Sequence, residues 1–299
     1  MALTTAARLA GFAPLGAPTR LTHPTVVRSP MLIAHRGGAG LAPENTMVAF
    51  RQAVDVWAAD MLELDVRATK DGHCVVIHDE VVDRTTNGTG AVRDMTLAEL
   101  QSLDAGHNFS RDRKTHPFRD SGVRVPTIDE VLESLPDTPI TVEVKTAEAQ
   151  APLFAAIARL DATQRVVAAG MYDRDRTMFG SYGGPISAST EQVRDFYRFH
   201  KLKLARFWSI NADVAQIPEF HGSHRIVTQK FVKALHTRGV KVHVWTVNVE
   251  SDMQRLLDWD VDGLVTDRPD TASRVLHRYV GRPLPPGLTD AANRAGAGD

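Results

Sequence analysis

Residues 63–67, ELDVR, are followed by a DG pair at 71–72 and by VVIHD at 75–79. Alternation of polar and apolar residues at period two predicts a strand with one polar face. An Asp-Gly pair between two β-rich runs predicts a hairpin with a two-residue loop. This stretch therefore predicts two antiparallel strands that carry acidic residues and a histidine.

The pairing of the two strands follows from the position of the loop. If Lys70 faces His73, counting back without a bulge places Asp65 opposite His78 and leaves Glu63 on the same face as Asp65. Two carboxylates and an imidazole would then share one patch. A hairpin whose polar face is simply exposed to solvent has the same pattern. The hairpin alone therefore does not decide between a functional site and an ordinary solvent-exposed face.

Two later stretches repeat the alternation. TVEVK at 141–145 places its glutamate and lysine on one face, and VKVHVW at 240–245 places its histidine and tryptophan opposite three valines. In a parallel barrel the valine faces would pack against outer helices and the polar faces would point inward, where charged residues are costly as core. The pattern indicates a charged layer that binds a metal ion and an anionic substrate.

Strands and helices alternate along most of the chain. The patterns predict strands at 31–35, 61–69, 74–78, 139–145, 165–169, 185–188, 212–217, 240–247 and 261–265, and helices at 45–58, 150–160, 173–180, 190–203, 228–238, 250–258 and 270–279. Omitting the hairpin's second strand leaves eight strand positions, and 299 residues suffice for the roughly 250 that a (β/α)8 barrel needs. The prediction is an α/β chain with a TIM barrel.

The barrel domain is predicted to span residues 31–279, with an insertion at about 79–126 after the second strand. Residues 1–30 read as an irregular extension without the apolar core of a signal peptide, and residues 280–299 as a flexible tail. Loops at the carboxyl ends of barrel strands carry binding function, so the insertion is expected at the rim of the site.

Composition and charge argue against nucleic acid and membrane lipid as binding partners. The net charge of -1 offers no basic surface for nucleic acid, and no apolar run is long enough for a transmembrane segment. The single cysteine, Cys74, excludes an internal disulfide and favours a reducing compartment, so a cytoplasmic location is expected. Any anion would bind in a local pocket, which suits a small-molecule substrate; the oligomeric state is left open.

A further motif precedes the hairpin. HRGG at 35–38 and PENT at 43–46 follow an apolar strand, and they supply a proton-transfer group, a fixed cation and flexible backbone, which suit a bound phosphate. Together with the hairpin carboxylates, this motif indicates metal-assisted cleavage of a phosphodiester.

The motifs taken together resemble the glycerophosphodiester phosphodiesterase family over roughly residues 31–279. The resemblance rests on IAHRG (33–37), PENT (43–46), ELDV (63–66), DG (71–72), IHD (77–79), RTTNGTG (84–90), VPTIDEVL (125–132), EVK (143–145), WTVN (245–248) and DGLVTDRP (262–269), in the family's order. It implies a TIM barrel with a family insertion that hydrolyses glycerophosphodiesters, such as glycerophosphocholine or glycerophosphoethanolamine, to glycerol 3-phosphate and an alcohol.

The resemblance also implies roles for particular residues. The catalytic histidines would be His35 and His78, with Arg36 beside the phosphate; the metal ligands Glu63, Asp65 and Glu143; the substrate-binding residues Arg36, Lys145 and Trp245; and the supporting residues Glu44 and Asn45. An all-oxygen ligand set favours Mg²⁺ or Ca²⁺ over zinc. Asn45 could instead cap a helix, and Trp245 could serve core packing alone.

Several alternatives stay open. The attacking oxygen is water or the substrate's own hydroxyl, and either histidine is the acid. Asn248 and Asp267 are read as helix caps and left out of the catalytic set, while Phe109, Phe118 and Tyr172 are candidates for the alcohol pocket. The competing activity is that of a lysophospholipase D or sphingolipid phospholipase D on the same barrel; a barrel that only binds is disfavoured, because both histidines and all three carboxylates are present.

Overall fold

The computed structural model describes residues 30–208 and 210–289; residues 1–29 of the predicted extension at 1–30 and residues 290–299 of the predicted tail at 280–299 lie outside them. Parallel strands lie in the order β5-β4-β2-β1-β10-β9-β6. Their bounds are β1 Met31–His35, β2 Met61–Ala68, β4 Ile140–Val144, β5 Val166–Gly170, β6 Val214–Pro218, β9 Lys241–Trp245 and β10 Gly263–Thr266. Strands β1 and β10, from opposite ends of the domain, pair with each other.

The ring closes between β5 and β6 through a short extended segment. Ala168 bridges to Ile186, and Ser187 bridges to Val214, both in the parallel sense. The predicted strand at 185–188 is thus reduced to isolated bridges, but it fills the fifth of eight positions. The structure confirms the predicted (β/α)8 barrel.

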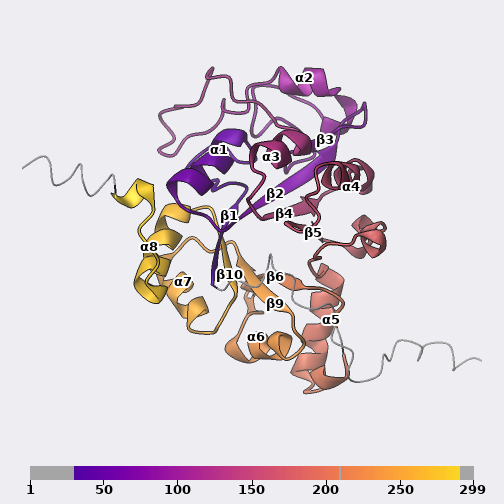
Figure 1. The fold of residues 1–299 in the computed structure, drawn as a ribbon, viewed down its shortest axis with the longest axis vertical. Helices are drawn as coiled ribbons and strands as arrows, with labels where there is room; N and C mark the ends of the chain where they lie inside the picture. Colours follow the sequence, from indigo (N-terminus) through magenta and orange to yellow (C-terminus); the bar gives the residue numbers. More distant parts are fainter. Residues whose placement is uncertain (1–29, 209, 290–299) are drawn as a thin grey trace, which may run out of the picture.

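Helices surround the strands, as Figure 1 shows. Their bounds are α1 Met47–Arg51, α2 Leu97–Gln101, α3 Ile128–Ser134, α4 Gln150–Arg159, α5 Thr190–Lys201, α6 Gln229–His236, α7 Glu250–Leu257 and α8 Pro269–Val280. Helix α1 continues as the π segment Gln52–Val56. A further short hairpin, β7 Phe220–His221 with β8 His224–Arg225, follows β6.

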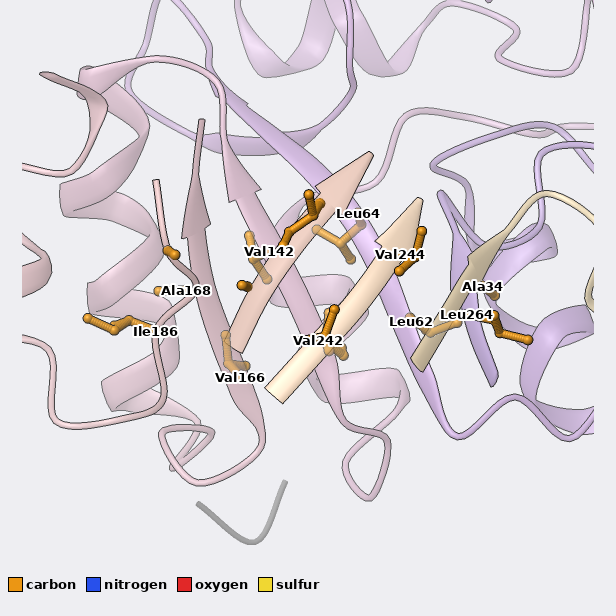
Figure 2. Close-up of a cluster of buried hydrophobic side chains, with 14 of the residues drawn as sticks. Ala34, Leu62, Leu64, Val142, Val166, Ala168, Ile186, Val242, Val244 and Leu264 are labelled. Atoms are coloured by element: carbon orange, nitrogen blue, oxygen red, sulfur yellow. The ribbon is translucent and has the colours of Figure 1, made fainter. Parts of the chain in front are cut away.

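The outward faces of the strands form the main hydrophobic core. Figure 2 shows part of it, with Leu62, Leu64, Val142, Val242 and Val244 among its members. These side chains are fully buried against the outer helices, as the alternation predicted. Burial of a side chain of this size contributes about 1.5–3 kcal/mol each, so the valine faces explain why the helices pack where they do.

The inward faces are mixed. Met31, Ile33, Met61, Val167, Val214 and Val265 pack together inside the barrel, with Trp245 against them. Thr141 and His243 are also fully buried there. The polar residues of the site lie beyond this apolar plug, at the carboxyl ends of the strands, where the loops of a barrel can reach them.

The hairpin differs from its prediction by one residue. Strand β3, Cys74–Val76, pairs with β2 so that Val66 faces Val76, and the Ile77 amide donates to the Asp65 carbonyl. The predicted pairing of Asp65 with His78 is therefore wrong. The loop has three residues, because the Thr69 hydroxyl bonds to both the Asp71 carboxylate and the His73 amide, and Gly72 takes a φ of 83°.

The segment after β5 also departs from the predicted helix at 173–180. Two 3₁₀ turns, Asp173–Asp175 and Phe179–Ser181, replace it. The Met178 amide donates to the Gln150 side chain from α4, so this backbone group is satisfied outside any helix of its own.

Residues between β3 and α3 form the insertion, which includes the 3₁₀ turn Val92–Asp94 and α2 and lies beside β3 in Figure 1. The insertion has its own small core, in which Val82, Val92 and Leu100 pack against Val75 and Ile77 of the hairpin. The hairpin thus faces the barrel on one side and the insertion on the other.

Candidate active site

Three carboxylates converge at the carboxyl ends of β2 and β4. Glu63 and Asp65 are two residues apart on β2, and Asp65 is in register with Glu143 on β4. One oxygen from each lies within 4.8 Å of the others. Glu63 and Asp65 are buried, so each ionised group raises the free energy of the other.

The cluster carries an excess of negative charge. Burial, together with the charge of Asp65, raises the pKa of Glu63 to about 7. Asp65 is equally buried, but the charges of Lys145 and Arg36 outweigh that burial and hold its pKa below the usual range. Three oxygen donors with unbalanced charge fit a hard divalent cation such as Mg²⁺ or Ca²⁺.

Two cations flank these carboxylates. The Lys145 ammonium lies 2.8 Å from Glu143 and 2.9 Å from Asp65. The Arg36 guanidinium donates to Glu44 at 2.8 Å, and its Nε lies 3.3 Å from Asp65. Both are partly buried and face the same pocket as the carboxylates, so they are placed to bind an anion there.

The loop after β1 positions Arg36. Its backbone lies in the left-handed region, with a φ of 50°, and its amide donates to Glu63 at 3.0 Å. The chain turns sharply at Gly37, where a Cβ would lie 2.8 Å from Ala49 and Phe50 of α1. Only glycine fits there, which explains the first glycine of the HRGG motif.

Asn45 supports the carboxylates rather than the helix. Its amide nitrogen donates to the Asp65 carboxylate at 3.0 Å, whereas the N-cap of α1 is Thr46, whose hydroxyl accepts from the Ala49 amide. The alternative prediction of Asn45 as a helix cap is wrong, because Thr46 occupies the cap position and the Asn45 side chain bonds to Asp65 on β2.

Each candidate histidine is paired with an aspartate through Nδ1. His35 Nδ1 lies 2.7 Å from Asp267, and His78 Nδ1 lies 2.6 Å from Asp79. An ionised carboxylate accepts only, so Nδ1 carries the proton in each pair and Nε2 is left for other chemistry. Burial lowers the pKa of His35, but the hydrogen bond to Asp267 and the charge of Glu63 outweigh it and raise this pKa above its ordinary value.

Sequence reasoning missed Asp267 and Asn248 as members of the site. The Asn248 amide donates to Asp267 at 2.8 Å, and its oxygen accepts from the Asp267 amide. Asp267 is 232 residues from His35 along the chain. The available signal was their position: Asp267 directly follows β10, which pairs with β1, and Asn248 lies in the loop after β9, which pairs with β10.

The residues surround one pocket of about 440 Å³. Its charged and titratable lining residues include His35, Arg36, Glu63, Asp65, His78, Glu143 and Lys145, and its apolar and aromatic lining residues include Met171, Tyr172, Val193, Tyr197, Ile217, Ile226 and Trp245. Trp245 lines the pocket and also packs on the inner core. Its position is therefore compatible with both predicted roles, substrate binding and core packing. Of the aromatic candidates, Tyr172 lines the pocket, while Phe109 and Phe118 pack on each other in the insertion.

A second group of possible metal ligands lies in the insertion, at Asp104, His107 and Asp120. Both Asp104 oxygens already accept backbone amides, from Gly106 and Asp120. This group is therefore explained by turn formation. Among the described residues no helix has the length and apolar character needed to cross a membrane.

Comparisons with known proteins agree with this geometry. The model of the glycerophosphoryl diester phosphodiesterase family matches residues 35–271. A glycerophosphodiester phosphodiesterase of Caldanaerobacter subterraneus subsp. tengcongensis is 33% identical, over 83% of this chain and 98% of its own. A human relative named lysophospholipase D GDPD1 is 30% identical, over 83% of this chain and 86% of its own.

A solved structure shows the same fold. The glycerophosphoryl diester phosphodiesterase domain of a Mycobacterium tuberculosis protein superposes with a TM-score of 0.75 at 21% identity, covering 82% of this chain and 98% of the other. The family model spans most of the barrel, and it includes both histidines and all three clustered carboxylates. The chain belongs to the glycerophosphoryl diester phosphodiesterase family.

Proposed function

We propose that this chain hydrolyses glycerophosphodiesters to glycerol 3-phosphate and an alcohol. The observation that carries the proposal is the convergence of three carboxylates, two aspartate-bound histidines and two cations on one pocket. Family membership favours the same substrate class. Glycerophosphocholine and glycerophosphoethanolamine are suitable test substrates.

Glu63, Asp65 and Glu143 would hold a divalent cation, which when bound offsets the charge of the phosphodiester and polarises a phosphoryl oxygen. Arg36 and Lys145 bind the remaining phosphate oxygens. The Lys145 ammonium lies beside two of these carboxylates and lines the same pocket, so it is placed to contact a phosphate bound next to them. These contacts act on charge that shifts onto the phosphoryl oxygens during the reaction.

His35 and His78 transfer protons through Nε2. One takes the proton of the attacking oxygen and the other gives a proton to the leaving alkoxide, each role contributing roughly 10²–10⁴ in rate. Asp267 and Asp79 accept from Nδ1 of the two rings, so Nε2 is the transferring atom in each: at the start it is unprotonated in the base and protonated in the acid, which is then an imidazolium.

The test is release of glycerol 3-phosphate by metal-loaded protein, with and without chelator. His35→Ala and Glu143→Gln should abolish release, whereas His73→Ala, at an exposed histidine of the hairpin loop, should not. Full activity after exhaustive removal of metal would refute the carboxylate assignment. Absence of release by folded, metal-loaded protein would refute the substrate assignment.

A second candidate activity is that of a lysophospholipase D. It is favoured by the apolar side of the pocket, where Met171, Val193 and Ile226 could contact part of an acyl chain. The human relative's name points the same way. Choline release from lysophosphatidylcholine that exceeds release from glycerophosphocholine, and that Val193→Asp suppresses, would establish this activity; equal loss on both substrates would count against it.

A further inference from the structure

One arginine of the insertion uses its whole guanidinium on the candidate site. Arg84 donates from Nε to Asp79 at 2.6 Å, and from Nη1 and Nη2 to the two oxygens of Glu44 at 2.7 and 2.8 Å. Glu44 lies 40 residues earlier in the chain, on the loop after β1. Arg84 therefore joins the insertion to the barrel by a two-point contact with one carboxylate and a single contact with another.

Each of these carboxylates also holds a residue of the proposed mechanism. Glu44 accepts from Arg36 at 2.8 Å, and Asp79 accepts from His78 at 2.6 Å. A continuous chain of charge-assisted hydrogen bonds thus runs from His78 through Asp79, Arg84 and Glu44 to Arg36. Such bonds are stronger and more directional than neutral ones, and a planar guanidinium can hold two carboxylates in fixed relative positions.

The backbone that carries Arg84 is itself held in place. The Asn108 amide donates to the carbonyls of Arg84 and Thr86, and Val82 is fully buried in the small core of the insertion. The Thr86 hydroxyl donates to the Val82 carbonyl, closing the turn. The guanidinium is about half exposed, so this fixed backbone, more than burial of the side chain, sets its direction.

The electrostatics agree with this arrangement. Hydrogen bonds from Arg84 hold the pKa of Asp79 well below its usual range, and the same contacts raise the pKa of Arg84. Burial alone would raise the pKa of Glu44, but Arg84 and Arg36 together lower it. Both carboxylates are therefore kept ionised as acceptors for His78 and Arg36.

We propose that Arg84 is a positioning residue that fixes the proton-transfer histidine His78 and the phosphate-binding Arg36 relative to one another. The inference rests on the proposed function and assigns the insertion a part in it. Without the shared guanidinium, Asp79 and Glu44 repel each other and the His78 ring loses its fixed orientation. Small displacements of reacting groups lower rates strongly, so the loss should fall on turnover more than on substrate binding.

The experiment compares Arg84→Met, Arg84→Lys and Arg84→Gly with Arg93→Met in metal-loaded protein acting on glycerophosphocholine. Arg93 is a matched control, since it is an exposed arginine of the same insertion paired with Glu80. Arg84→Met should lower kcat by about 10–100-fold while KM changes less than about threefold. Arg84→Lys should recover only part of this loss, because an ammonium cannot make the two-point contact with Glu44.

Guanidinium ion, added below denaturing concentrations, should raise the kcat of Arg84→Gly and leave Arg84→Lys unchanged. A kcat for folded Arg84→Met within about twofold of wild type would overturn the proposal. So would a loss in Arg84→Gly that guanidinium does not relieve.

A readout that needs no turnover separates this proposal from the proposed function. The His78 Nδ1 proton, hydrogen-bonded to Asp79, should give a low-field proton resonance that is assigned by its absence in His78→Gln. That resonance should broaden or disappear in Arg84→Met and persist in Arg93→Met. Persistence in Arg84→Met would overturn the positioning role, whereas a wild-type protein that shows the resonance but hydrolyses no substrate would refute only the proposed function.

Discussion

His35 Nδ1 lies 2.7 Å from Asp267 Oδ1, and the other oxygen of Asp267 accepts from the Asn248 amide. The Asp267 carboxylate thus holds the imidazole of His35. Asn248, in the loop after β9, in turn holds Asp267, and β9 is the strand that pairs with β10. The contact joins the first and last strands of the barrel at the point where they pair. Ring closure therefore sets the orientation of His35.

Replacing Asp267 by Asn should lower kcat by about 10²-fold or more while the protein stays folded, because an amide can stabilise the wrong tautomer of His35. Steady-state kinetics and a thermal melt check both parts. Asp270→Asn is the matched control, since that carboxylate binds Arg268 in the same loop and touches neither histidine. Equal kcat values for the two variants would contradict the role given to Asp267.

Glu63→Gln should stabilise the metal-free protein at pH 8 by about 1–3 kcal/mol. Burial and neighbouring charge raise the pKa of Glu63 to about 7, so the folded state binds a proton more tightly than the unfolded state. Wild-type stability should then fall as the pH rises from about 4.5 through about 7, and the variant should lose that slope.

Denaturant unfolding of both proteins between pH 5 and pH 8 provides the measurement. Adding Mg²⁺ or Ca²⁺ at pH 8 should raise the melting temperature of wild type more than that of Glu63→Gln. The idea fails if the wild-type slope survives the substitution or if the variant responds to metal as strongly as wild type.

His243 should make the protein sensitive to acid. It is fully buried inside the barrel, and neither ring nitrogen has a hydrogen-bond partner among residues 30–208 and 210–289. Burial lowers its pKa to about 4, so the unfolded state binds the proton more tightly and stability is lost as the pH falls from about 6.5 toward 4.

His243→Leu should reduce that loss by about 1–3 kcal/mol, because it removes the group that must stay neutral in the folded state. Urea unfolding at pH 7 and pH 4.5 measures the effect. His224→Leu is the control, since that histidine lies on β8 and is exposed. Identical pH dependence in wild type and His243→Leu would exclude this source of acid lability.

Tyr172→Ala should change the relative rates on glycerophosphodiesters that differ in their alcohol. Tyr172 lines the pocket, whereas Met178, on the same segment, lies outside the lining. Met178→Ala should therefore leave the ranking of substrates unchanged. Competition assays with paired substrates give the ratios directly, and an unchanged ranking in Tyr172→Ala would remove it from the specificity residues.

Much of the fold followed from local patterns in the sequence. The valine faces of residues 140–144 and 241–245 predicted strands covered by helices, and both are buried in the outer core. The predicted helix at 190–203 is confirmed as α5, which begins with a capping box at Ser189, whereas α3, which begins with a capping box at Thr127, was not among the predicted helices. The predicted helix at 173–180 is wrong: two 3₁₀ turns take its place, and the Met178 amide bonds to Gln150 of α4, a long-range contact that has no local signature.

For the candidate site, the sequence pointed to most of the residues that line the pocket, but it missed Asp267 and Asn248 and did not predict how the side chains are arranged. Glu63 and Asp65 had to share a face because they are two residues apart on one strand. The direction of His78 could not be derived in this way, since β3 ends at Val76 and the alternation of a strand no longer applies two residues later. A three-residue loop in place of a two-residue loop changed the register by one.

By itself, the sequence determined the alternating strands and helices, the carboxylates that share β2, and the family to which the motifs point. The tertiary structure decided which side chains hold one another: Asp267 with His35, Arg84 with Glu44, and Asn45 with Asp65. Local periodicity fixes which face a residue occupies, because it follows from backbone geometry over a few residues. Pairs separated by 20 to 232 residues depend on closure of the barrel and docking of the insertion, which no local pattern records.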